Sequence, residues 1–134
     1  MCIRDSHEVD SQIEFHESDL LTAITTNESE QFDFVVSNPP YVSELEYAEL
    51  SSEVKEFEPR TALVGGAQGT EIIERLVPQA AVAIKPGGWL IIEISPMIAE
   101  AVRGLFTLDS GFSSCEIKTD HAGHLRTVVA QRAA

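Results

Sequence analysis

The sequence has little cysteine, little positive charge and no long hydrophobic run. Its two cysteines, Cys2 and Cys115, are too few for a disulfide framework, and this scarcity is typical of proteins from the reducing cytoplasm. The longest apolar run spans only residues 80–84, whereas a membrane-spanning helix needs about 20 apolar residues. We therefore expect a cytoplasmic protein without a membrane span, in which 134 residues form one hydrophobic core.

Basic residues are scarce, since 9 Lys and Arg oppose 22 Asp and Glu, for a formal net charge of −13. Residues 1–66 hold 15 of these acidic side chains and only 3 of the basic ones. Proteins that bind a nucleic-acid backbone rely on clustered Lys and Arg, so direct nucleic-acid binding is not expected. The acidic half is either a solvated surface or a surface suited to a basic protein partner.

Strand and helix patterns alternate along the chain. Alternation predicts a short half-buried strand at residues 12–16, and compact apolar runs predict two buried strands at Phe32–Ser37 and 89–94. Apolar spacings of three and four residues predict helices at 47–57, 70–84 and 96–105. Two alternating segments, at 114–119 and 125–131, predict a closing antiparallel hairpin. Loops are expected at 22–31 and 63–69 and a turn at 85–88. This order indicates a mostly parallel α/β sheet with its active site at the carboxyl ends of the strands.

The strongest motif is Asn38-Pro39-Pro40-Tyr41, which directly follows the apolar run ending at Ser37. The two prolines fix the backbone, so the Asn38 carboxamide and a neighbouring carbonyl form two acceptors aimed at one NH₂ group. Tyr41 adds an aromatic wall for a planar group. Four residues taken alone also match ordinary turns, so the motif needs support from the rest of the chain.

That support comes from three further motifs in the same order as in a known family. From about residue 13 to residue 132, the chain resembles the HemK-like methyltransferases, which use S-adenosylmethionine to methylate a glutamine side-chain nitrogen in peptide chain release factors. The matching motifs are Glu58-Pro59-Arg60 with Gly65, Gly66 and Gly69, the apolar run 90–94 with Glu93, and Asp120, Gly123 and Arg126.

The resemblance implies a Rossmann-like class I methyltransferase fold whose first two strands are missing, with a terminal antiparallel hairpin. Residues 1–6 match nothing in the family and are expected to be a non-native leader before a partial methyltransferase domain at 7–134. The strand at 34–37 should lie beside that at 89–94, with the hairpin beyond. Residues 13–15 should either detach or pair with the exposed edge of 34–37.

The resemblance also implies roles for individual residues. Asn38 and the Pro39 carbonyl would accept the two N–H bonds of the glutamine amide, and Pro40 and Tyr41 complete the catalytic and substrate-binding loop. Asp19 and Leu20, together with Asn38, match positions near the adenine and methyl ends of S-adenosylmethionine. No counterpart of the family's glycine-rich cofactor loop is present, so the cofactor site is expected to be incomplete and this chain alone inactive.

Other assignments follow from weaker patterns. Glu58 and Arg60 are either surface charges or a pair that braces the 38–41 loop, and we favour the pair. His121 and His124 are expected to be solvated turn residues, so no metal site is predicted. Two alternative functions stay open: a nucleic-acid amino-methyltransferase, which the charge and the 58–69 stretch oppose, and a non-catalytic remnant that binds a protein partner.

Overall fold

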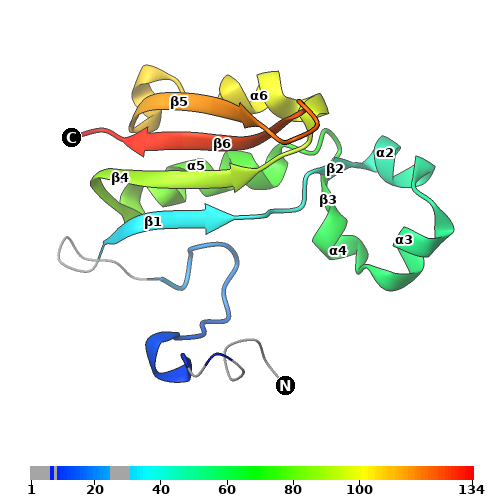
Figure 1. The fold of residues 1–134 in the computed structure, drawn as a ribbon, viewed down its shortest axis with the longest axis horizontal. Helices are drawn as coiled ribbons and strands as arrows, with labels where there is room; N and C mark the ends of the chain where they lie inside the picture. Colours follow the sequence, from blue (N-terminus) through cyan, green and yellow to red (C-terminus); the bar gives the residue numbers. More distant parts are fainter. Residues whose placement is uncertain (1–6, 8, 25–30) are drawn as a thin grey trace.

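The structure is a computed structural model that describes residues 7, 9–24 and 31–134. The expected leader at 1–6 and most of the expected loop at 22–31 lie outside the described residues. One sheet has the strand order β1-β4-β6-β5 (Figure 1), formed by β1 (Phe32–Ser37), β4 (Ile84–Glu93), β6 (Leu125–Arg132) and β5 (Phe112–Thr119). β1 runs parallel to β4, whereas β6 is antiparallel to both of its neighbours. The expected neighbours and the closing hairpin are confirmed.

The hydrophobic core lies between this sheet and α5 (Glu71–Ala83). Ile73, Leu76 and Ala80 of α5 are buried, as their helical spacing predicts, and they belong to the same cluster as Leu90 and Ile92 of β4. Pro78 lies inside the helix, where it removes one backbone donor without ending the helix. Burial of the apolar faces of helix and sheet supplies the main stabilisation of the fold.

Short helices connect β4 to β5 and contact β5 (Figure 1). After β4, Ser95 caps η2 (Pro96–Ile98) by accepting a hydrogen bond from the Met97 backbone N–H at 3.2 Å, as the Ser-Pro pair predicts. The chain continues into α6 (Ala99–Arg103), which is shorter than expected because it ends at Gly104. η3 (Leu108–Ser110) then leads into β5, and Gly111 between them has a left-handed φ of 84°.

The outer face of β1 is exposed, although the sequence predicts a buried strand. Only Val35 is buried, at 8% exposure, whereas Phe34 and Val36 are 58% and 71% exposed. β1 is an edge strand, and among the described residues no helix covers the face that carries Phe34 and Val36. An apolar run therefore predicted the strand correctly but could not reveal which of its faces another element covers.

The expected strand at 12–16 is wrong. The structure has a short helical turn, η1 (Asp10–Gln12), followed by exposed irregular chain at 13–17. Alternation over so few residues produces a strand only where a neighbouring strand supplies hydrogen bonds, and the described part of the sheet offers none there. Of the two expectations for residues 13–15, detachment from the sheet is the one confirmed.

Residues 42–66 project from the carboxyl edge of the sheet (Figure 1). β2 (Val42–Ser43) pairs in parallel with β3 (Val64–Gly66), and between them lie α2 (Glu44–Glu49), α3 (Ser52–Phe57) and α4 (Arg60–Leu63). The single helix expected at 47–57 is wrong, because Ser51 starts a second helix by accepting from the Val54 N–H at 3.5 Å. α4 and β3 likewise occupy the first part of the loop expected at 63–69.

Two smaller results complete the fold. The turn expected at 85–88 is part of β4, where the pairing with β1 shifts register between Phe32 and Phe34. This irregularity allows Gly87, with a φ of 80°, to remain within the strand. No helix in the described ranges is both long enough and apolar enough to cross a membrane.

Candidate functional site

The 38–41 loop lies at the carboxyl end of β1 and leads directly into β2. Pro39 is buried, which anchors the loop, whereas Asn38 is exposed. Among the described residues, no hydrogen bond engages the Asn38 side chain or the Pro39 carbonyl. Both acceptors that the motif predicts are therefore available for a ligand.

These acceptors border a pocket of about 550 Å³ between the 38–41 loop and the helices of the projecting segment. The walls combine polar groups of the loop with apolar side chains from α3 and α4. The lining residues are Asn38, Pro39, Tyr41, Val42, Val54, Glu58, Ala62 and Leu63. The pocket joins a carboxamide, an aromatic ring and an apolar wall, which is a suitable environment for a planar amide.

Residues 65–69, which contain three glycines and are called the glycine stretch below, pack closely against the backbone of the 38–41 loop. A Cβ atom at Gly65 would lie 2.4 Å from the Pro40 carbonyl oxygen, and one at Gly69 would lie 2.4 Å from the Tyr41 carbonyl oxygen. Only glycine permits so close an approach of two backbones, and Gly69 also has a left-handed φ of 84°. The Pro40 and Tyr41 carbonyls therefore face the glycine stretch.

Glu71 holds this glycine stretch in shape at the start of α5. Its carboxylate accepts a hydrogen bond from the Gln68 backbone N–H at 3.0 Å. That bond is the main cause that lowers the pKa of Glu71, helped by the N–H groups of residues 69–71 and opposed by partial burial. The carboxyl also lies so close to Gly66 that a Cβ there would be 2.3 Å from it.

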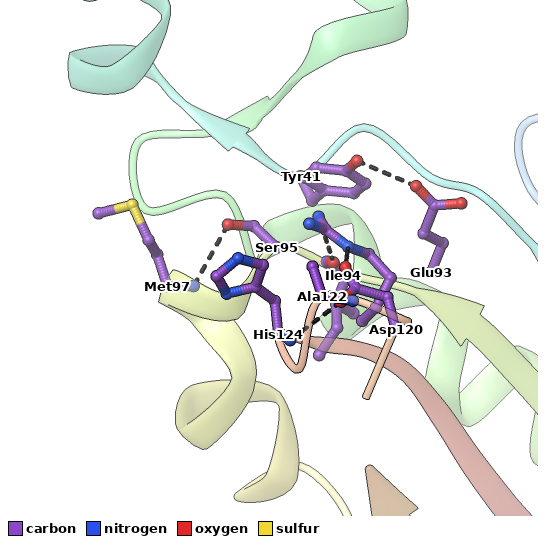
Figure 2. A network of polar contacts seen from close by, with 9 residues as sticks. Tyr41, Glu93, Ile94, Ser95, Met97, Asp120, Ala122 and His124 are labelled. Atoms are coloured by element: carbon purple, nitrogen blue, oxygen red, sulfur yellow. Dashed lines mark hydrogen bonds and ion pairs between the residues drawn. The ribbon is translucent and has the colours of Figure 1, made fainter. Parts of the chain in front are cut away.

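Tyr41 is fixed by a neighbouring strand. Its phenol donates a hydrogen bond to Glu93 Oε1 at 3.2 Å, from the carboxyl end of β4 (Figure 2). Burial is the largest cause that raises the pKa of Tyr41, followed by the charge of Glu93 and its hydrogen bond, while Arg126 opposes the rise. Parallel pairing of β1 and β4 brings the two side chains to the same edge of the sheet.

Arg126 links this pair to the hairpin turn. Its Nε donates to Asp120 Oδ2 at 3.3 Å, and one of its terminal nitrogens lies 3.5 Å from the Ile94 carbonyl. Asp120 in turn accepts from the backbone N–H groups of Ala122 and His124, at 2.9 and 3.0 Å (Figure 2). The His124 bond is the first cause that lowers the pKa of Asp120.

The sequence did not assign functional roles to several of these residues. Glu93, Asp120 and Arg126 match motif positions of the family, but the sequence alone predicts no role for them. The family resemblance is the one signal that points to these residues. Val54, Ala62 and Leu63 carried no signal as pocket residues, because their contact with the loop depends on how α3 and α4 fold back.

Asp19 and Leu20 do not line the pocket. Asp19 forms an ion pair with Arg75 of α5, and the adjacent Leu21 N–H donates to Gln79 Oε1 at 2.9 Å. Leu20 packs against the core with a positive φ of 55°. Of the three residues predicted to hold the cofactor, only Asn38 lines this pocket. The roles of Asp19 and Leu20 remain predictions.

The expected Glu58–Arg60 pair is wrong. Arg60 pairs with Glu44 of α2 and lies over the Tyr47 ring, 5.5 Å from its centroid, whereas Glu58 lines the pocket. One residue separates Glu58 from Arg60, and the start of α4 at Arg60 turns the guanidinium toward α2. His121 and His124 are exposed in the hairpin turn, and the described side chains include no cluster of three metal-binding groups.

Comparisons with known proteins identify a methylase family and several similar methyltransferases. Residues 2–63 match the family described as Eco57I restriction-modification methylase. Over 117 residues the chain is 44% identical to the release factor glutamine methyltransferase of Rhodopirellula baltica, covering 87% of this chain and 39% of that protein. It is 41% identical over 124 residues to the one from Koribacter versatilis, covering 92% and 42%. The chain thus spans about two fifths of the length of these relatives.

Solved structures support the fold. The E. cuniculi Mtq2–Trm112 complex, described as responsible for methylation of the translation termination factor eRF1, matches with a TM-score of 0.57 at 21% identity, over 97% of this chain and 67% of that one. A possible exported protein from Bordetella parapertussis matches with a TM-score of 0.55 at 18% identity, over 98% and 48%. The expected Rossmann-like methyltransferase fold with an incomplete sheet is confirmed. Over most of its length, the chain is therefore similar to one part of the release factor glutamine methyltransferases, as its motifs predict.

Proposed function

We propose that the 38–41 loop binds a glutamine side-chain amide of a peptide chain release factor and presents its nitrogen for S-adenosylmethionine-dependent methylation. The observation that carries this proposal is the pair of available acceptors, on Asn38 and Pro39, beside a pocket walled by Tyr41. The names of the relatives point to the same substrate. We place the reaction in the cytoplasm, as the low cysteine content suggests.

The chemistry requires a well-oriented amide. A glutamine amide nitrogen is a poor nucleophile because its lone pair is delocalised into the carbonyl. Asn38 Oδ1 accepts one N–H of the amide and the Pro39 carbonyl accepts the other, which raises the electron density on nitrogen and fixes its direction. Orientation of this kind lowers a barrier by about 7–11 kcal/mol. When bound, S-adenosylmethionine supplies an electrophilic methyl group.

A nucleic-acid methyltransferase is the second candidate, because the Eco57I restriction-modification methylase family matches residues 2–63. Charge argues against it. All the described basic side chains are already engaged: six form ion pairs with acidic side chains, and two donate to backbone carbonyls. The six are Arg60, Arg75, Lys85, Arg103, Lys118 and Arg126, and the two are Lys55 and Arg132. No free basic stripe therefore remains among them to hold phosphates.

A substrate-choice assay tests the proposal. Because the chain spans about two fifths of its relatives' length, it is assayed both alone and fused behind the amino-terminal part of the R. baltica relative. Each protein receives S-adenosylmethionine with a labelled methyl group, together with a release factor, duplex DNA and RNA. We expect the fusion to label only the release factor. Label in DNA or RNA, or an inactive but folded fusion, would contradict the proposal.

A further inference from the structure

A polar cluster lies next to the pocket, and of its four members only Tyr41 also lines the pocket. It consists of Tyr41, Glu93, Arg126 and Asp120, which come from three segments far apart in the chain. The carboxyl ends of β1 and β4 and the start of β6 meet at one edge of the sheet, because β6 runs antiparallel to β4. The cluster therefore joins the 38–41 loop to the rigid part of the fold.

Successive contacts connect the hairpin turn to the 38–41 loop. Backbone N–H groups of the hairpin turn orient the Asp120 carboxylate, and Asp120 holds Arg126 at 3.3 Å. Arg126 is near enough to Tyr41 to oppose the effect of Glu93 on the phenol. Glu93 accepts the Tyr41 hydroxyl at 3.2 Å. Each member is partly shielded from solvent, so these bonds are less screened than those of an exposed pair.

The Tyr41 ring also lines the pocket. Tyr41 belongs to the same four-residue loop as the two predicted hydrogen-bond acceptors, Asn38 and the Pro39 carbonyl. We propose that Glu93 is a positioning residue for the 38–41 loop: by accepting the Tyr41 hydroxyl, with Arg126 held alongside by Asp120, it fixes the ring that orients the acceptor amide. This inference rests on the proposed function for its effect on methyl transfer, but the contact itself can be tested without any activity.

The first experiment follows the phenol of Tyr41 by ultraviolet absorbance in the 134-residue chain. The sequence has only two tyrosines, so Tyr47→Phe leaves Tyr41 as the sole phenol. In that background, Glu93→Gln removes the negative charge but keeps an acceptor oxygen, and we expect Tyr41 to titrate at lower pH. Glu100→Gln, which changes an exposed carboxylate on α6, is the matched control and should leave the titration unchanged. Far-ultraviolet circular dichroism at each pH restricts the comparison to folded protein.

The second experiment measures kcat and KM of the fusion with a release factor. Glu93→Ala removes the acceptor, and we expect kcat to fall about 10- to 100-fold with KM little changed, because a misplaced amide reacts slowly. Glu93→Gln should retain most of the parental rate, because the glutamine oxygen still accepts the Tyr41 hydroxyl. If the negative charge of Glu93 mattered instead of the hydrogen bond, Glu93→Gln would be as slow as Glu93→Ala.

The two failures can be told apart. An unchanged Tyr41 titration in folded Glu93→Gln, or parental kcat in Glu93→Ala, would overturn the inference. A parent fusion that methylates no glutamine would overturn the proposed function, and the titration would then decide the inference by itself.

Discussion

Replacing Gly65 by alanine would push directly on the 38–41 loop. The new Cβ would lie 2.4 Å from the Pro40 oxygen and 2.8 Å from the Gly69 oxygen, and both atoms belong to the backbone. Because Cβ atoms essentially never come within 3.0 Å of another atom, the Pro40 carbonyl must move by at least about 0.6 Å. A shift approaching 1 Å in a catalytic group costs about 10²-fold in rate. The overpacking lowers the free energy of unfolding by about 1–3 kcal/mol.

Gly88→Ala is the matched control for this variant. Its Cβ would lie 2.7 Å from the Asp33 oxygen and from Ile84 Cγ2, so the same overpacking occurs where β4 pairs with β1, away from the pocket. Urea unfolding followed by circular dichroism compares the two losses of stability, and the methyl-transfer assay of the fusion compares their rates. We expect similar destabilisation but a large loss of kcat only in Gly65→Ala. Parental kcat in folded Gly65→Ala, or equal losses in both variants, would refute the reasoning.

Three further predictions concern the rest of the chain. We expect the exposed edge strand β1 to make the chain self-associate, and Val36→Lys should reduce that association in sedimentation experiments, because Val36 is 71% exposed; unchanged association would show that β1 is not the contact. The folded-state pKa of Asp120 is lowered, so its stabilising effect is present above the ordinary pKa of an aspartate and is lost as pH falls through the lowered one. Asp120→Asn should therefore flatten the acid limb of a stability–pH curve measured by thermal unfolding. Calorimetry of residues 1–134 with S-adenosylmethionine should show weak or undetectable binding, since the sequence has no counterpart of the family's glycine-rich cofactor loop; a micromolar dissociation constant would contradict this.

The sheet was predictable where the sequence carries strong periodic patterns. In α5, the helical spacing of apolar residues continues over several turns, and in β5 and β6 the alternation continues along each strand. Tertiary packing therefore reinforces the structure that each pattern predicts. The failures occur where tertiary context decides. Two serine caps divide residues 43–57 into separate helices, and no described strand of the sheet takes up residues 12–16.

The candidate site was predictable in part. The rigid loop, its exposed Asn38 and its place at the carboxyl end of β1 follow from the order of an apolar run and two prolines. The partner of Tyr41 did not follow, because Glu93 lies 52 residues away and only the parallel pairing of β1 with β4 brings it close. The close approach of Gly65 to Pro40 was also hidden, since sequence shows a glycine but not the backbone that passes over it.

The proposed role of Asn38 is to orient a glutamine amide for methylation, and peptide mass spectrometry of the treated release factor tests this role most directly. Asn38 is exposed and makes no described hydrogen bond within the protein, so Asn38→Ala should leave the thermal unfolding of the fusion nearly unchanged. With the parent fusion, we expect one methyl group on a glutamine side chain of the release factor, and with Asn38→Ala almost none. Near-parental methylation of that glutamine by folded Asn38→Ala, or a methyl group on any other residue type, would contradict the account.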